Sequence, residues 1–148
     1  AQEMLRAVKS AVLRADALVM AAAVADYRPR EPSGRKIKKS GAGLSLELEL
    51  TPDILSEVKG NFVRVGFAAE SEKLVANARK KLKQKNLDLI VANDITAPDS
   101  GFGVDTNRVT IVDKAGKVDS LPLLSKREVA ERVLDRVAGM IPPQRRKI

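Results

Sequence analysis

The chain contains no cysteine, no histidine and no tryptophan among its 148 residues. The lack of cysteine excludes disulfides, thiolate nucleophiles and cysteine-ligated zinc or iron-sulfur sites. The lack of histidine excludes Ser-His-Asp triads, histidine general bases and histidine-ligated metals. What remains is chemistry done by lysine, carboxylates, backbone amides and an oxygen-bound cation, a set that is typical of phosphoryl and nucleotidyl transfer.

Aromatic side chains are also scarce, since Tyr27, Phe62, Phe67 and Phe102 are the only ones. They supply few platforms on which the bases of a single-stranded nucleic acid could stack. The apolar run from Ala17 to Ala23 is too short to cross a membrane. With no signal peptide visible, we expect a cytoplasmic protein without a membrane partner.

Positive charge is plentiful, because 27 Lys and Arg residues against 19 Asp and Glu residues leave a net charge of +8. Such a surface favours anionic partners, namely nucleotides, phosphorylated metabolites or nucleic acid. A hydrophobic content of 44% at this length predicts one globular domain with a core. We place this domain at residues 1–141 and a frayed basic tail at residues 142–148.

Apolar spacing along the chain alternates between helical and strand periods. It predicts helices near residues 1–15, 51–60, 72–83 and 125–137, a buried strand at 17–23, a strand with one wet face at 44–50, and further strands near 62–68, 87–92, 108–112 and 121. The order indicates an α/β, Rossmann-like three-layer fold whose mostly parallel sheet has an antiparallel hairpin at its edge. Ligands of such sheets bind beyond the carboxyl ends of the strands, where the loops after Ala23, Ala68 and Ala92 should meet.

Hydroxyl residues mark the predicted helix starts. Thr51 is expected to cap the helix that begins with Pro52, and Ser71 is expected to cap the helix near 72–83. Ser125 and Glu128 have the spacing of a capping box, which predicts the start of the last helix.

Asp26 and a basic loop follow the first apolar run. Asp26 is suited either to bind a metal ion or to close the strand through an Asx turn. The loop contains Pro32 and Gly34 and then the basic residues Arg35, Lys36, Lys38 and Lys39. It either closes over a polyphosphate as a lid or is a solvated loop.

Three further features have both a structural and a functional interpretation. Pro52 to Leu55 is most simply a helix start whose free amides could also receive a phosphate. Phe67 fits a core position on pattern alone. Lys81 and Lys85 lie four residues apart, with Asn77 one turn earlier, so all three side chains point the same way. The alternative for these lysines is a solubilising surface.

Seven segments occur in the order AAAVADYRP, KIKK, TPDIL, VGFAAE, NLDLIVAND, GFGVDTN and LPLLSKREVA. Together they resemble the phosphopantothenate cysteine ligase domain of the bacterial bifunctional coenzyme A biosynthesis proteins, over nearly the whole chain. The resemblance implies an enzyme that joins 4′-phosphopantothenate to cysteine. In that family CTP and Mg²⁺ activate the carboxylate as an acyl-cytidylate with loss of pyrophosphate, and the cysteine amine then displaces CMP.

The resemblance also implies roles for individual residues. Met20, Ala21 and Ala22 would border the cytidine site, and Asp26 would face the triphosphate and its Mg²⁺. Lys36 would be the catalytic lysine, stabilising charge as the acyl-cytidylate forms and reacts. The remaining nucleotide contacts would be Pro52, Asp53, Ile54, Leu55, Phe67, Lys81 and Lys85.

The sequence departs from the family pattern at its start. That pattern begins with a strand, a glycine-rich turn and an Asn-containing segment that handles phosphopantothenate, usually behind a fused flavin-dependent decarboxylase domain. We find none of these here, and we expect the chain alone to be a poor or inactive ligase that keeps part of the nucleotide site. The resemblance further implies a homodimer whose active site draws on both protomers, with the hairpin from Val109 to Leu121 as a candidate contributor.

Three alternatives stay open at this point. One is the same ligase using ATP, as the eukaryotic relatives do. The second is a basic nucleic-acid-binding module, built on the face from Arg79 to Lys85 and the tail residues Arg145 to Lys147. The third is a structural dimerisation fragment.

Overall fold

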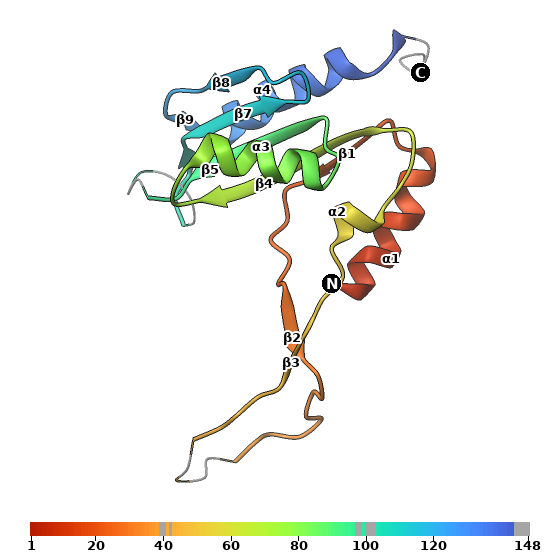
Figure 1. The fold of residues 1–148 in the computed structure, drawn as a ribbon, viewed down its shortest axis with the longest axis vertical. Coiled ribbons are helices and arrows are strands. Elements are labelled where there is room, and N and C mark those ends of the chain that lie inside the picture. The colour runs from red at the N-terminus through yellow and green to blue at the C-terminus, as the bar shows by residue number, and fades with distance from the viewer. Residues whose placement is uncertain (39–40, 42, 97–98, 100–102, 144–148) are drawn as a thin grey trace.

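The computed structural model describes residues 1–38, 41, 43–96, 99 and 103–143. Its centre is a five-stranded sheet with the order β1-β4-β5-β7-β8 (Figure 1). These strands are β1 (Ala17–Met20), β4 (Val63–Glu70), β5 (Leu89–Asp94), β7 (Val109–Asp113) and β8 (Val118–Ser120). β1, β4 and β5 are parallel, whereas β7 is antiparallel to both β5 and β8. The predicted α/β fold with an antiparallel hairpin at the sheet edge is therefore confirmed.

Helices cover both faces of this sheet, and each face has its own apolar core. Helices α1 (Gln2–Ala11), α2 (Ile54–Glu57) and α3 (Leu74–Gln84) share one face with the short 3₁₀ turn Val12–Arg14, and α4 (Lys126–Met140) covers the other. The period-two alternation of β5 divides its side chains, since Ile90 and Ala92 join the first core while Leu89 and Val91 join the second. The three-layer arrangement follows from this division.

The helix starts agree with the sequence only in part. Ser125 and Glu128 form the predicted capping box at the start of α4. Asp53, not Thr51, caps α2 by accepting a hydrogen bond from the Ser56 amide. The Thr51 hydroxyl donates to the Ala25 carbonyl instead. The predicted Ser71 cap is also wrong, because α3 begins after Lys73, which adopts a left-handed conformation with no side-chain cap.

The strand at the start of the sheet is shorter and more exposed than predicted. β1 ends at Met20, and Met20 is its only buried residue, while Val19 is 37% exposed. The prediction of a buried strand over residues 17–23 is wrong because β1 occupies the sheet edge, where no other described strand pairs with its outer side.

Strands β2 (Tyr27–Pro29) and β3 (Leu48–Leu50) form a separate antiparallel pair that projects from the body (Figure 1). We call this pair and the loop between its strands the arm. The alternating pattern over residues 44–50 predicted a strand with one wet face, but β3 begins only at Leu48. The apolar residues of the segment 44–50 are between 55% and 71% exposed, namely Leu44, Leu46, Leu48 and Leu50. No described element covers the arm, so the dry face that the pattern implied is absent from this structure.

Two short strands, β6 (Thr106–Asn107) and β9 (Leu124–Ser125), pair beside the start of α4. Lys39, Phe102 and the tail from residue 144 lie outside the described residues, so the proposed tail boundary stays a prediction. Among the helices of the described ranges, none has the length and apolar character to cross a membrane.

Candidate functional site

A cavity of about 760 Å³ opens beside the carboxyl ends of β1 and β4. Its walls come from four segments: the end of β1 with the chain that follows, the start of α2, the end of β4, and the face of α3 that carries lysines. All predicted site residues except Ala21 and Lys36 line it, namely Met20, Ala22, Asp26, Pro52, Asp53, Ile54, Leu55, Phe67, Lys81 and Lys85. We call this space the rim cavity.

The α2 wall is held in place by close packing on β4. A side chain at Gly66 would place its Cβ 2.7 Å from Leu87 Cδ1 and 3.3 Å from Leu55 Cδ1. Glycine at this position therefore lets Leu55 approach the strand directly, and both Ile54 and Leu55 are buried. This packing fixes the segment from Pro52 to Leu55 at the cavity.

Arg64 ties two cavity walls together and was not among the predicted residues. Its buried guanidinium donates hydrogen bonds to the carbonyls of Leu55, Val58 and Lys85, and it lies 5.8 Å from the centre of the Phe62 ring. Leu55 and Val58 belong to α2 and its C-cap, and Lys85 is the C-cap of α3. The sequence signal was a single arginine within an apolar strand, which predicts burial with hydrogen bonds but not the partners.

Both lysines of the rim cavity are ion-paired. Lys81 Nζ lies 2.7 Å from Glu70 Oε1, and Lys85 Nζ lies 3.1 Å from Asp53 Oδ2. The Glu70 side chain is only 8% exposed, whereas that of Asp53 is 44% exposed. Asn77, predicted to share their face, donates to Glu70 Oε2 at 3.0 Å.

The other basic residues of α3 differ from these two. Arg79, Lys80 and Lys83 are exposed, while Lys81 and Lys85 are partly buried against the cavity. The solubilising interpretation thus suits the first three, and the acids that anchor the other two come from other elements of the chain.

Asp53 has several partners at the start of α2. Partial burial alone would raise the pKa of its carboxyl, but hydrogen bonds from Ser56 and the hydrogen bond and charge of Lys85 outweigh that effect. The pKa of Asp53 therefore lies below its ordinary value. The ionised carboxylate can compete with an anionic ligand for Lys85.

Asp26 is an exposed carboxylate at the mouth of the cavity. Its backbone carbonyl accepts a hydrogen bond from the Thr51 amide at 2.9 Å, which ties this segment to the chain that leads into α2. No group of three or more acidic side chains that could enclose a metal occurs among the described residues. One carboxylate together with substrate phosphates is nonetheless an ordinary Mg²⁺ environment, so Asp26 fits that donor set.

The two remaining predicted residues lie elsewhere. Lys36 is exposed in the loop of the arm and does not line the rim cavity. Ala21 lines a neighbouring cavity of about 420 Å³, which shares Ala22 and Phe67 with the rim cavity and reaches Lys126. Sequence reasoning also missed Tyr27, which lines the rim cavity where β2 meets the body.

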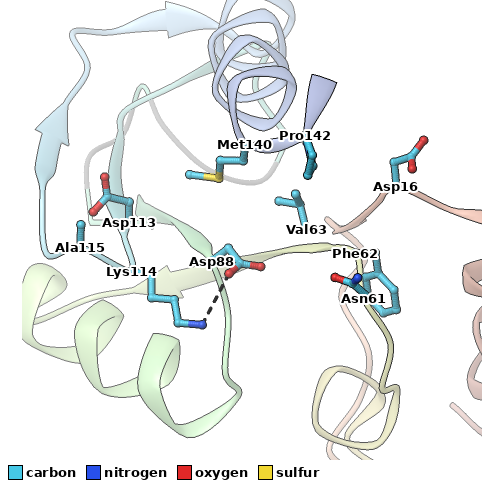
Figure 2. Close-up of a pocket in the computed structure, with 10 residues that line it drawn as sticks. All are labelled: Asp16, Asn61, Phe62, Val63, Asp88, Asp113, Lys114, Ala115, Met140 and Pro142. Carbon is cyan, nitrogen blue, oxygen red and sulfur yellow. Dashed lines mark ion pairs between the residues drawn. The ribbon is translucent and has the colours of Figure 1, made fainter. Parts of the chain in front are cut away.

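A third cavity lies at the opposite end of the sheet and serves as a contrast (Figure 2). Its volume is about 470 Å³, and its charged residues are Asp16, Asp88, Asp113 and Lys114, with Lys114 Nζ 3.7 Å from Asp88. Three acids against one base disfavour a polyphosphate there. The rim cavity, where Lys81 and Lys85 balance Asp26 and Asp53, is less acidic and collects most of the predicted site residues.

Comparison with known proteins assigns the chain to a family. Residues 1–140 match the family model described as the DNA/pantothenate metabolism flavoprotein C-terminal domain. The chain belongs to this family. The predicted resemblance to the ligase domain of the bifunctional coenzyme A biosynthesis proteins is thereby confirmed as a family relationship.

Individual members of the family show how much of each protein is shared. The coenzyme A biosynthesis bifunctional protein CoaBC of Bacillus subtilis (strain 168) is 46% identical over 143 residues, which cover 95% of this chain and 35% of that protein. A cysteine/cysteine sulfinic acid decarboxylase from an unknown prokaryotic organism is 40% identical over 145 residues, which cover 95% of this chain and 40% of that protein. The crystal structure of the C-terminal domain of a CoaBC protein matches with a TM-score of 0.74 at 39% identity, over 95% of this chain and 62% of that one. The chain therefore spans well under half the length of these curated relatives, whose names describe longer proteins.

Proposed function

We propose that this domain acts in a ligase that joins 4′-phosphopantothenate to L-cysteine, using CTP and Mg²⁺, as a cytoplasmic step of coenzyme A biosynthesis. Support comes from the seven ordered motifs, from family membership, and from the role in coenzyme A biosynthesis that the name of the B. subtilis relative prints. The chain covers 35% of that relative and 40% of the one named as a decarboxylase, so each name describes a protein longer than this domain.

The rim cavity is the observation that carries the proposal. Residues from Met20 to Lys85, distant in sequence, meet there and include two lysines and an exposed aspartate. Its volume of about 760 Å³ lies within the range usual for small-molecule sites, about 300–1,000 Å³. We assign the triphosphate to the side of Lys81 and Lys85, and the cytidine to the wall formed by Met20, Ala22 and Phe67.

The proposed reaction needs no protein nucleophile. A carboxylate oxygen of phosphopantothenate forms a bond to the α-phosphorus of CTP while the bond to pyrophosphate breaks. The cysteine nitrogen then bonds to the acyl carbon and loses a proton as CMP leaves. Both the carboxylate and the triphosphate are anionic, so lysines must screen their approach and stabilise the transition-state charge.

Four residues share three distinct roles in this proposal. Asp26 would hold Mg²⁺ together with the phosphates, and the ion would neutralise part of their charge. Lys81 and Lys85 would bind the phosphate chain before any bond changes. Lys36, carried by the arm, would act on the reacting group once the loop reaches the cavity of its own or of a partner protomer.

The proposed homodimer concerns the arm. Its exposed leucines, Leu48 and Leu50 among them, form an apolar surface on a two-stranded sheet that no described element covers. Two-stranded sheets are marginal in isolation, and apolar surfaces of this kind commonly mark contact sites. We therefore propose the arm as a surface for a second copy of the chain, in addition to the hairpin from Val109 to Leu121.

Calorimetric titration with CTP and Mg²⁺ tests the nucleotide part of the proposal. We expect saturable binding that weakens in Asp26→Asn when Mg²⁺ is present and changes little when it is absent. Competition with ATP separates the CTP-dependent from the ATP-dependent form. The absence of CTP binding, or binding of an oligonucleotide with a steep salt dependence, would favour the nucleic-acid module instead.

A further inference from the structure

We infer that Glu70 is a positioning residue that holds the ammonium group of Lys81 toward the phosphate chain of the nucleotide. The inference rests on the proposed nucleotide site. It adds Glu70, the last residue of the VGFAAE segment, which does not line the rim cavity and was not among the predicted site residues.

Glu70 occupies an unusual place for a carboxylate. It is the last residue of β4, its side chain is 8% exposed, and its backbone pairs in register with Asp94 of β5. A carboxylate at this depth is costly to ionise without a cationic partner and further hydrogen bonds. The chain supplies both of these from α3.

The two Glu70 oxygens have different partners. Oε1 lies 2.7 Å from Lys81 Nζ, and Oε2 accepts a hydrogen bond from Asn77 Nδ2 at 3.0 Å. Asn77 Nδ2 also donates to the Glu72 carbonyl at 2.9 Å. Because Asn77 is itself anchored at the Glu72 carbonyl, the Glu70 carboxylate presents its other oxygen to Lys81 in a fixed direction.

This arrangement limits the freedom of Lys81. A lysine side chain on a helix surface samples many rotamers, and its ammonium group has three donors. The ion pair between Lys81 Nζ and Glu70 Oε1, at 2.7 Å, restrains the ammonium group at the cavity wall, and its donors remain available for phosphate oxygens. The conformational entropy of the Lys81 side chain is then already reduced before the nucleotide binds, so less entropy is lost on binding.

The ion pair of the other cavity lysine, Lys85, is more exposed than that of Lys81. Lys85 pairs with Asp53, whose side chain is 44% exposed and itself lines the cavity. An exposed acid inside the cavity competes with the ligand, whereas a buried acid behind Lys81 supports it. Because Glu70 is buried, it can orient Lys81 without competing with the nucleotide for it, whereas the exposed Asp53 can compete for Lys85.

The test uses Glu70→Gln, which keeps the size of the side chain and an acceptor for Asn77 but removes the charge. We expect the Kd for CTP with Mg²⁺ to rise about tenfold, the scale of one charge-assisted hydrogen bond reduced by solvent exposure. In a Lys81→Met background the same change should alter the Kd by less than about twofold, because the pair acts as a unit. Glu72→Gln, the same change at an exposed position, is the matched control and should leave the Kd unaltered.

A ligand-free measurement separates this inference from the proposed function. The ¹⁵N signal of the Lys81 ammonium, observable when an ion pair slows proton exchange, should be present in the wild type and lost in Glu70→Gln. A wild-type chain that binds no CTP overturns the proposed function, while the ammonium signal still decides whether Glu70 restrains Lys81. If CTP binds but Glu70→Gln has no effect, or if its effect persists without Lys81, the inference fails and the proposed function stands.

If Glu70→Gln does not fold, Asn77→Ala removes only the second support of the carboxylate. We expect a rise in Kd of about threefold, which also depends on Lys81. An unchanged or lowered Kd in this variant would contradict the positioning role.

Discussion

The rim cavity and the arm both carry residues of the predicted site, yet they are positioned by different means. The cavity walls are held by the sheet, by the packing of Leu55 over Gly66, and by the three carbonyls that Arg64 binds. The arm is a two-stranded pair whose apolar side chains remain exposed. Packing within the chain determines where Lys81 lies, whereas no described contact determines where Lys36 lies.

This difference divides the proposed chemistry into two parts. Nucleotide binding requires groups that are in place before the ligand arrives, and the core of the domain supplies them. Charge stabilisation by Lys36 requires the arm to hold this residue next to the reacting group. Contact with a second protomer could fix the arm in that position. Variants in the two regions should therefore separate binding and stability from assembly and turnover.

The largest effect should come from Arg64→Met, which removes the donor that joins the ends of α2 and α3. Two buried carbonyls and one partly buried carbonyl would lose their donor, so we expect the free energy of unfolding to fall by about 3 kcal/mol. Urea unfolding followed by circular dichroism measures this. Arg6→Met, at an exposed position of α1, is the control and should change stability by less than about 0.5 kcal/mol. Equal losses in the two variants would show that the cavity walls do not depend on Arg64.

A smaller effect is expected when the two lysines are compared. Lys81→Met should weaken CTP binding by about 10- to 100-fold, the range for losing a hydrogen bond to a charged group. Lys36→Gln should weaken it by less than about threefold, since Lys36 does not line the cavity. In a preparation with ligase activity, Lys36→Gln should instead lower the turnover rate by about 10²- to 10³-fold.

Titration and steady-state kinetics on the same samples separate these outcomes. A strong loss of CTP binding in Lys36→Gln would mean that the arm already reaches the cavity without a substrate. That result would remove the contrast between the two regions.

The next prediction concerns the apolar surface of the arm. Leu48→Ser combined with Leu50→Ser should weaken self-association by about tenfold or more, because each buried leucine contributes roughly 1.5–3 kcal/mol. Light scattering across a concentration series measures this. The matched control is Leu134→Ser, since Leu134 on α4 is 56% exposed and lies outside the arm. A change of association in the control alone would locate the dimer surface elsewhere.

Local sequence patterns predicted features that depend on neighbouring residues. The apolar strand near residues 87–92, the Ser125–Glu128 capping box and the spacing of Lys81 and Lys85 each follow from a short window, and the structure contains all three. Features that depend on distant partners could not be predicted in the same way. Glu70 and Lys81 meet because β4 and α3 pack together.

The errors have a similar origin. Thr51 has good cap chemistry, but its hydroxyl is taken by the carbonyl of Ala25 on the opposite side of the arm. The alternation over residues 44–50 identifies an apolar face without identifying what covers it. For Arg64, the surrounding apolar residues indicate burial. They do not indicate which three carbonyls accept its hydrogen bonds, because those carbonyls lie outside the strand that carries Arg64.

The smallest effect should come from Asp53→Asn, which removes the acid that competes for Lys85. Asparagine caps helices about as well as aspartate, so α2 should remain intact. We expect CTP affinity to rise by about two- to threefold, the scale of an exposed ion pair. Calorimetry with Ser56→Ala is the control, because that variant loses the hydroxyl bond to Asp53 Oδ2 but keeps the charge of Asp53 and the capping bond from the Ser56 amide. A fall in affinity would mean that the Asp53 carboxylate itself contributes to the nucleotide site.

The same variant should also change how stability depends on pH. The pKa of Asp53 is lowered on folding from an ordinary value of 3.8, so the folded state favours the ionised form. Its contribution is complete above that value and is lost as the pH falls through the lowered pKa. The wild type should therefore lose more stability than Asp53→Asn between pH 5 and pH 3, on the order of a few tenths of a kcal/mol because the pair is solvent-exposed. Identical acid limbs for the two proteins would show that the bonds from Ser56 and the charge of Lys85 do not stabilise the ionised Asp53 in the folded state.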